Sequence, residues 1–318
     1  MKVLLPTNIA TVTPTSVPEV PGVEWAWADP HAPIPAEHLD ADVWAAWMNP
    51  AGVVADAAAN LHRVRLVQSF AAGVENLLAA GFGPAVQICS GAGLHDRTVA
   101  EHLMSLLLAL VRRIPDSVRQ QASHDWQHQE RINWQASAAT KLHSLHGARV
   151  LIWGFGSIAA SLTPMLQAFG AEVRGAARTA GERHGVPVVD ESGLAAELAA
   201  ADIVILLMPG GPETRHVLNA ERLALLQPHA LVLNAGRGTT IDQDALVEAL
   251  RAGRLGGAGL DVVDPEPLPA SSPLWDAPRL LITPHHGGGR PINAIELLLH
   301  NVQALRSGSE LRNLVPRT

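Results

Sequence analysis

The chain has 318 residues, of which 47% are hydrophobic and 17% charged, and its formal net charge is -7 at pH 7. This length suits two domains better than one. A mildly acidic chain without a basic run offers no electrostatic reason to bind nucleic acid. We therefore expect a two-domain globular protein with no nucleic-acid partner.

Cysteine content and apolar runs bear on compartment and metal binding. The single cysteine, Cys89, excludes an intrachain disulfide and disfavours a thiolate metal site. The apolar start at 1–6 is too short for a signal peptide. The longest apolar run, 103–111, falls well short of the roughly 20 residues that a membrane span needs. These features predict a cytoplasmic protein with no metal and no membrane partner.

The first part of the chain alternates short apolar runs with connections rich in proline and alanine, as small α/β domains do. Strands are expected over 3–5, 43–47, 66–68 and 86–89, with a helix over 50–61. A long helix is expected over 98–112, where apolar residues recur at helical spacing, and Pro115 is expected to end it. The polar stretch 116–146 is interpreted as a helical extension or excursion.

From residue 148 onward, apolar strands alternate with amphipathic helices. Strands are expected over 150–153, 171–174, 203–208, 231–234, 259–262 and 280–283. The helix expected over 158–169 contains Pro164, which removes one backbone bond. This order predicts a doubly wound parallel sheet. A last amphipathic helix over 294–305 indicates that the chain leaves its first domain and later returns to it, with a small substrate expected in the cleft between the domains.

A dinucleotide-binding fingerprint, GxGxxA, spans 154–159. Gly154 permits a tight turn, Gly156 allows backbone to approach a pyrophosphate, and Ala159 is small enough for close helix–sheet packing. The helix N-terminus then offers N–H groups to the phosphates. Because the fingerprint follows an apolar strand and opens a helix, it predicts a dinucleotide site rather than a structural turn.

The residues after the second strand predict which dinucleotide is preferred. An acidic residue that binds the ribose 2′-hydroxyl is expected about 20 residues past the glycines. Ala177 stands there, with Arg178 and Thr179 beside it. A cation and a hydroxyl suit a 2′-phosphate, which a carboxylate would repel. We therefore expect NADP(H) to be favoured over NAD(H); the alternative is that Arg178 is a solvated loop residue.

Three segments at the ends of the later strands carry unusual chemistry. In 234–238, two glycines flank Arg237, whose guanidinium can bind a carboxylate or polarise a carbonyl. In 259–267, acids stand in and after a strand end; in 283–288, His285 precedes two glycines. A histidine paired with a carboxylate stays protonated near neutral pH and can donate a proton. The expected partner is Glu266, with Asp261 a second candidate.

In this order, these segments resemble the D-isomer-specific 2-hydroxyacid dehydrogenase family over nearly the whole chain. Further segments carry the resemblance: 72–75 (AGVE), 99–102 (VAEH), 207–209 (LMP) and 212–214 (PET). The resemblance implies two Rossmann-like domains, a discontinuous substrate domain and a homodimer formed through the cofactor domain. We place the substrate domain at 1–97 and 291–318 and the dinucleotide-binding domain at 98–290.

The family's roles carry over to matching positions in this chain. His285 would be the acid/base, Glu266 its partner and Arg237 the substrate anchor. The predicted cofactor-binding residues are Gly154, Gly156, Ser157, Ile158, Arg178, Thr179, Met208, Pro209, Thr214, Ala235, Asp261 and Gly287. The predicted substrate-binding residues are Trp47, Ala72, Gly73, Val74, Arg237 and His285. The chain departs from the family at Ala159 and at His286, beside the predicted acid.

Within the family, the glyoxylate/hydroxypyruvate reductase branch is favoured. The segment 46–50 (AWMNP) resembles its substrate loop and carries Met48 and Asn49 where phosphoglycerate dehydrogenases usually place an arginine. Alternatives are a D-3-phosphoglycerate dehydrogenase-like enzyme, a reductase of larger sugar acids and a non-enzymatic NAD(H)-sensing corepressor. The corepressor is disfavoured because no long tail follows, and Glu266 argues against a formate dehydrogenase.

Overall fold

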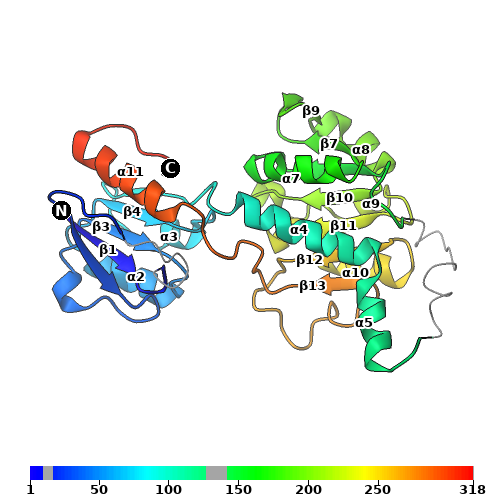
Figure 1. The fold of residues 1–318 in the computed structure, drawn as a ribbon, viewed down its shortest axis with the longest axis horizontal. Coiled ribbons are helices and arrows are strands. Elements are labelled where there is room, and N and C mark those ends of the chain that lie inside the picture. Colours follow the sequence, from blue (N-terminus) through cyan, green and yellow to red (C-terminus); the bar gives the residue numbers. More distant parts are fainter. Residues whose placement is uncertain (10–16, 127–141, 318) are drawn as a thin grey trace. The chain divides into compact units, whose positions relative to one another are not determined.

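The structure is a computed structural model that describes residues 1–9, 17–126 and 142–317. It divides into two compact units (Figure 1), one of Met1–His95 with Gly289–Thr318 and the other of Asp96–Gly288. The expected boundaries, 97/98 and 290/291, lie two residues beyond these divisions. The first unit is therefore discontinuous in sequence, and the second is a single insertion within it.

The first unit is built on a parallel sheet of order β2-β1-β3-β4-β5. Its strands are β1 (Lys2–Pro6), β2 (Glu24–Ala28), β3 (Val43–Ala46), β4 (Leu66–Ser69) and β5 (Gln87–Cys89). Its helices are α2 (Ala51–Asn60), α3 (Glu75–Ala79) and α11 (Ala294–Ser307). Side chains alternate across a strand. Val3 and Leu5 accordingly share a cluster with α11, while Leu4 shares one with α2.

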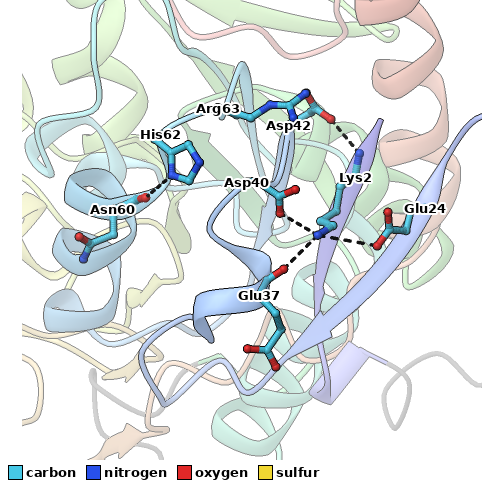
Figure 2. Close-up of polar contacts among 8 residues, drawn as sticks. All are labelled: Lys2, Glu24, Glu37, Asp40, Asp42, Asn60, His62 and Arg63. Atoms are coloured by element: carbon cyan, nitrogen blue, oxygen red, sulfur yellow. Dashed lines mark hydrogen bonds and ion pairs between the residues drawn. The ribbon is translucent and has the colours of Figure 1, made fainter.

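A cluster of charged side chains connects the amino ends of β1 to β4 (Figure 2). Lys2 Nζ lies 2.7 Å from Asp40 Oδ1 and 3.8 Å from Glu24 Oε1. The Lys2 backbone N–H donates to Asp42 Oδ2 at 2.8 Å, and Arg63 Nη2 lies 3.3 Å from Asp42 Oδ1. Because the predicted substrate loops follow the carboxyl ends of β3 and β4, this cluster lies at the opposite edge of the sheet and stabilises the unit rather than a site.

The second unit contains an eight-stranded sheet of order β13-β12-β11-β10-β6-β7-β9-β8. Its strands are β6 (Arg149–Trp153), β7 (Glu172–Ala176), β8 (Gly181–Arg183), β9 (Val186–Val189), β10 (Ile203–Leu206), β11 (Leu231–Asn234), β12 (Gly257–Leu260) and β13 (Leu280–Ile282). All neighbours are parallel except β8 and β9. The first strand, β6, lies between β7 and β10, so the order reverses there, where doubly wound folds bind ligands.

Helices cover both faces of this sheet. Two of them, α4 (Asp96–Val111) and α7 (Ser157–Ala168), share one apolar cluster. On the other face pack α8 (Glu191–Ala200), α9 (Ala220–Leu223) and α10 (Gln243–Arg251). The expected α/β fold with doubly wound parallel sheets is confirmed. No helix within the described ranges is long and apolar enough to cross a membrane.

Several elements differ from the sequence-based predictions. Strands β2, β8 and β9 were not expected. The buried residues of β2 and β9 alternate with exposed or half-buried ones, and β8 has no buried residue. Pro115 does not end the preceding helix: α4 ends at Val111, and Pro115 lies in the first turn of α5 (Ile114–Ala122). Proline is tolerated there because the N–H groups of a helix's first turn have no intrahelical acceptor, so no hydrogen bond is lost. Of the expected extension over 116–146, residues 127–141 lie outside the described part.

Pro164, exposed in the interior of α7, yields a stability prediction. Proline cannot donate the backbone bond that this position would otherwise make. Pro164→Ala should raise the free energy of unfolding by about 1–2 kcal/mol. The restored hydrogen bond stabilises the helix by more than the added conformational entropy stabilises the unfolded chain. Urea denaturation measures this. Pro115→Ala is the matched control and should give no gain, and a lower stability for Pro164→Ala would contradict the argument.

Candidate active site

The glycine-rich turn lies between β6 and α7. Gly154 has a φ of 100°, and a Cβ there would lie 2.7 Å from the Leu207 carbonyl carbon, so both conformation and packing require glycine. Gly156 differs: its φ of -113° suits any residue, and a Cβ would meet no atom within 4 Å. Since nothing within the protein requires glycine at 156, this position fits the close approach of a ligand.

The start of α7 is open to an anion. Asp190 and Asp242 cap α8 and α10 with their side chains, whereas no side chain caps α7 at Gly156. The backbone N–H groups of the first turn therefore keep their hydrogen-bonding capacity for a ligand. The predicted residues Ser157 and Ile158 occupy this turn. The turn and the uncapped helix together fit the pyrophosphate of a dinucleotide.

The loop after β7 is bonded by a cation, Arg183, that the sequence did not predict. Arg178, the predicted 2′-phosphate ligand, is exposed in this loop. Arg183, on β8, donates through Nη1 to the Phe155 carbonyl (3.1 Å) and through Nη2 to the Thr179 hydroxyl (2.9 Å). It thus bonds the glycine-rich turn to the 177–179 loop. No sequence motif identifies it, because its position depends on the unexpected β8–β9 hairpin.

Close backbone contacts bring the later loops together. A Cβ at Gly236 would lie 2.6 Å from the Met208 carbonyl oxygen, and a Cβ at Gly238 would lie 2.0 Å from the Val263 carbonyl carbon. Each contact joins the loops of neighbouring strands. Thr214 also bonds back to Pro209, its Oγ1 donating to the carbonyl at 2.8 Å. The predicted residues around 208–214 and 235–238 are therefore neighbours.

Arg237 is half-buried on a backbone that is tightly held. Its carbonyl accepts hydrogen bonds from Asn234 Nδ2 (2.9 Å) and Thr240 Oγ1 (2.7 Å). Its guanidinium donates through Nη1 to the Gly236 carbonyl at 2.8 Å. A fixed backbone and a directed guanidinium suit a cation that must meet a substrate in one orientation.

His285 and Glu266 form a hydrogen-bonded pair. His285 Nδ1 lies 2.7 Å from Glu266 Oε2, and Glu266 Oε1 accepts from the Val263 backbone N–H at 3.1 Å. The hydrogen bond to Glu266 raises the pKa of His285 against the opposing effects of burial and of Arg237. Burial would raise the pKa of Glu266, but the bond and charge of His285 bring it below its ordinary value. The two groups therefore favour an imidazolium–carboxylate pair.

The Asp261 carboxylate is not the hydrogen-bonded partner of the His285 ring. Its side chain is 3% exposed, and its Oδ1 accepts from the Thr283 hydroxyl at 2.6 Å and from the His286 N–H at 3.1 Å. Its Oδ2 accepts from the Gly287 N–H at 3.0 Å. The carboxylate thus organises the backbone after His285, and of the two candidate partners the structure selects Glu266.

In the first unit, Trp47 and the 72–74 loop follow β3 and β4. The Trp47 indole stacks on His95 with ring centroids 5.4 Å apart, and its Nε1 has no hydrogen-bond partner among the described residues. His95 Nε2 lies 2.7 Å from the Phe70 carbonyl oxygen. Ala72 is exposed and Val74 is buried. Among the described residues, no group of His, Cys, Asp or Glu is arranged to hold a metal.

Comparison with known proteins identifies this arrangement. The model of the D-isomer specific 2-hydroxyacid dehydrogenase NAD-binding domain matches residues 104–287, more than half of the chain. The chain belongs to the D-isomer specific 2-hydroxyacid dehydrogenase family. The matched range lies within the second unit, which is therefore the NAD-binding domain of this dehydrogenase, with the fingerprint and the His285–Glu266 pair both inside it.

Similar proteins extend over nearly the full length. A glyoxylate reductase of Thermococcus onnurineus is 30% identical over 266 residues, which cover 80% of this chain and 77% of that protein. A family member of Aeromonas salmonicida has a solved structure with a TM-score of 0.84, 29% identity and coverage of 100% of this chain and 99% of that one. The NADPH-dependent glyoxylate/hydroxypyruvate reductase of Sinorhizobium meliloti was solved with NADP and sulfate. Its structure has a TM-score of 0.79 and 25% identity, with coverage of 99% of this chain and 98% of that one.

The pairing of His285 with Glu266 yields a pH prediction. The raised pKa of His285 requires an anionic partner, so Glu266→Gln should lower that pKa and the imidazole should lose its proton at a lower pH. Titration of the His285 ring by NMR, assigned by loss of its signals in His285→Ala, measures the change. Glu248→Gln, which removes an exposed ion pair with Arg254, is the control. An unshifted His285 titration in Glu266→Gln would show that the pair does not govern this pKa.

Proposed function

We propose that this dehydrogenase reduces small 2-keto acids, of the glyoxylate or hydroxypyruvate type, to D-2-hydroxy acids with NADPH. The observation that carries the proposal is the His285–Glu266 hydrogen bond of 2.7 Å, in the NAD-binding domain whose strand-end loops also present Arg237. Two charge-complementary groups, a proton donor and a cation, are what a 2-keto acid requires. The glyoxylate reductases among the similar proteins support this substrate class.

The residues divide the reaction between them. A nicotinamide cofactor, when bound, would supply the hydride for C2. Because His285 Nδ1 is bonded to the Glu266 carboxylate, the transferable proton is the one on Nε2, which goes to the substrate carbonyl oxygen. The Arg237 guanidinium holds the substrate carboxylate or polarises the carbonyl. A carbonyl that gains a hydride and a proton becomes a hydroxyl, and neutral His285 is left paired with Glu266.

We propose that the first unit determines substrate specificity. Backbone amides of Ala72, Gly73 and Val74 would bind the carboxylate, and Trp47 would contact the substrate. Met48 and Asn49 offer no cation for a phosphate group, which favours small keto acids over phosphohydroxypyruvate. The assignment of unit 1 as substrate domain rests on the family resemblance and on the loops that follow its strands.

The cofactor residues are proposed in three groups. Gly154, Gly156, Ser157 and Ile158 would hold the pyrophosphate, and Arg178 with Thr179 the 2′-phosphate. Met208, Pro209, Thr214, Ala235, Asp261 and Gly287 would lie toward the nicotinamide, Asp261 through the backbone that it holds. The lack of an acid at Ala177 and the contacts of Arg183 around Thr179 support NADP(H) over NAD(H). A cytoplasmic homodimer is proposed from the family resemblance and the single buried cysteine.

The test is steady-state oxidation of NADPH and NADH with glyoxylate, hydroxypyruvate, phosphohydroxypyruvate and 2-ketogluconate in turn. We expect the highest kcat/KM with NADPH and a small keto acid. His285→Ala should lower kcat by about 100-fold or more, since general acid catalysis is worth that much, and should leave NADPH affinity nearly unchanged. Preference for phosphohydroxypyruvate would favour the phosphoglycerate alternative, and binding of cofactor without any turnover would favour a sensor.

A second prediction concerns the 2′-phosphate. Arg178→Ala should weaken NADPH binding by about tenfold or more, the value of one hydrogen bond to a charged group, and should leave NADH binding nearly unchanged. Fluorescence titration of both cofactors measures this. Arg254→Ala, a matched loss of an exposed arginine, should alter neither affinity. Equal losses for the two cofactors would remove Arg178 from the 2′-phosphate site.

A further inference from the structure

Helix α4 contacts the 283–288 segment, which carries His285, at two points one turn apart. The Thr98 hydroxyl donates to the Gly288 carbonyl at 2.6 Å. One turn later, His102 Nε2 lies 2.9 Å from Thr283 Oγ1. Residues four apart share one face of a helix. This face of α4 therefore fixes both ends of the segment.

The His102 ring must carry a proton on Nε2. Thr283 Oγ1 donates its hydrogen to Asp261 Oδ1 (2.6 Å), because an ionised carboxylate can only accept. His102 Nε2 lies 3.1 Å from the same Oδ1. Both neighbours therefore offer this nitrogen only acceptors. His102 is a donor that helps to satisfy a carboxylate almost fully removed from water, which would otherwise be costly to bury.

The Asp261 residue in turn holds the backbone around His285. Its carboxylate accepts the N–H groups of His286 and Gly287, and its own carbonyl accepts the His285 N–H at 2.8 Å. His285 has a φ of 50°, a left-handed conformation that side chains adopt when surrounding contacts hold them there. The same turn directs the imidazole toward Glu266. A Cβ at Gly287 would lie 2.8 Å from Asp261 Oδ2, so this packing allows no side chain there.

We propose that His102 is a positioning residue for His285: its Nε2–H fixes the Asp261 carboxylate, which fixes the turn that presents the His285 ring to Glu266. The importance of this for turnover rests on the proposed role of His285 as proton donor. In this role His102 acts through Asp261 and not on the substrate. Its effect is on the geometry of the acid.

The groups that surround these two histidines define a clean experiment. The charged groups that act on His285 are Glu266, Arg237 and Asp261. His102 faces Asp261 and packs against His286 in a T-shaped arrangement, with ring centroids 5.0 Å apart. Leucine at 102 removes the donor and adds no charge, whereas glutamine keeps an N–H donor. Any change in the titration of His285 that glutamine reverses therefore reports the lost hydrogen bond.

A matched control lies at the amino ends of the strands of the same sheet. His229 Nε2 lies 2.6 Å from Asp202 Oδ1, and these residues precede β11 and β10. His229→Leu therefore also breaks a poorly exposed His–Asp pair in this unit, but far along the strands from His285. If His102 merely stabilised the unit, the two leucine variants would have the same consequences for the site.

The experiment compares the full-length wild type with His102→Leu, His102→Gln and His229→Leu. The readouts are the NMR titration of His285, the melting temperature, and kcat and KM with NADPH and glyoxylate. We expect His102→Leu to lower the pKa of His285 and to lower kcat about 10- to 100-fold, as small misplacements of catalytic groups do. His102→Gln should recover most of both losses. His229→Leu should lower only the melting temperature.

A wild-type His285 titration in His102→Leu would overturn the proposal, and so would equal losses in His229→Leu. Should the leucine variant not fold, His102→Asn replaces it, because its shorter amide does not reach the position of Nε2. If the wild type shows no turnover with any keto acid, the proposed function falls. The NMR titration still decides the positioning role in that case, because it needs no substrate.

Discussion

The close approach of backbone to backbone at the carboxyl edge of the eight-stranded sheet is the constraint on which the rest of the NAD-binding domain depends. At Gly154, Gly236 and Gly238, a Cβ would come within 3 Å of a neighbouring loop's backbone. The four loops that follow β6, β10, β11 and β12 are therefore packed directly against one another. Only with side chains absent at these points can the glycine-rich turn, Arg237 and the Glu266 loop lie within one small region.

Three histidine–carboxylate pairs among the described residues of this domain show how location decides their use. His229 and Asp202 lie at the amino edge of the sheet, where they bond neighbouring strands. His102 and Asp261 lie at the carboxyl edge but are poorly exposed, so they shape backbone. His285 and Glu266 lie at the same edge and remain substantially exposed, at 49% and 36% of their side chains. The last pair combines a raised histidine pKa with exposure to a ligand.

The sequence anticipated the parts of the fold and site that depend on local pattern. The GxGxxA turn, the apolar strands and the strand-end residues Arg237, Glu266 and His285 could be found because each lies in a short segment with its own signature. Arg183 and His102 could not be found in this way. Each acts through a partner that is distant in sequence: Arg183 across the β8–β9 hairpin to Phe155, and His102 to Asp261 and Thr283.

By itself, the sequence determined the α/β class, most of the buried strands, the dinucleotide turn and the dehydrogenase family, because hydrophobic period, glycine placement and motif order are properties of contiguous residues. Only the tertiary structure decided that Glu266 rather than Asp261 bonds His285, that Pro115 begins a helix, and that His102 lies behind the proposed acid. These outcomes depend on distances between residues far apart in the chain, which the packing of α4 and the strand-end loops sets and no local pattern encodes.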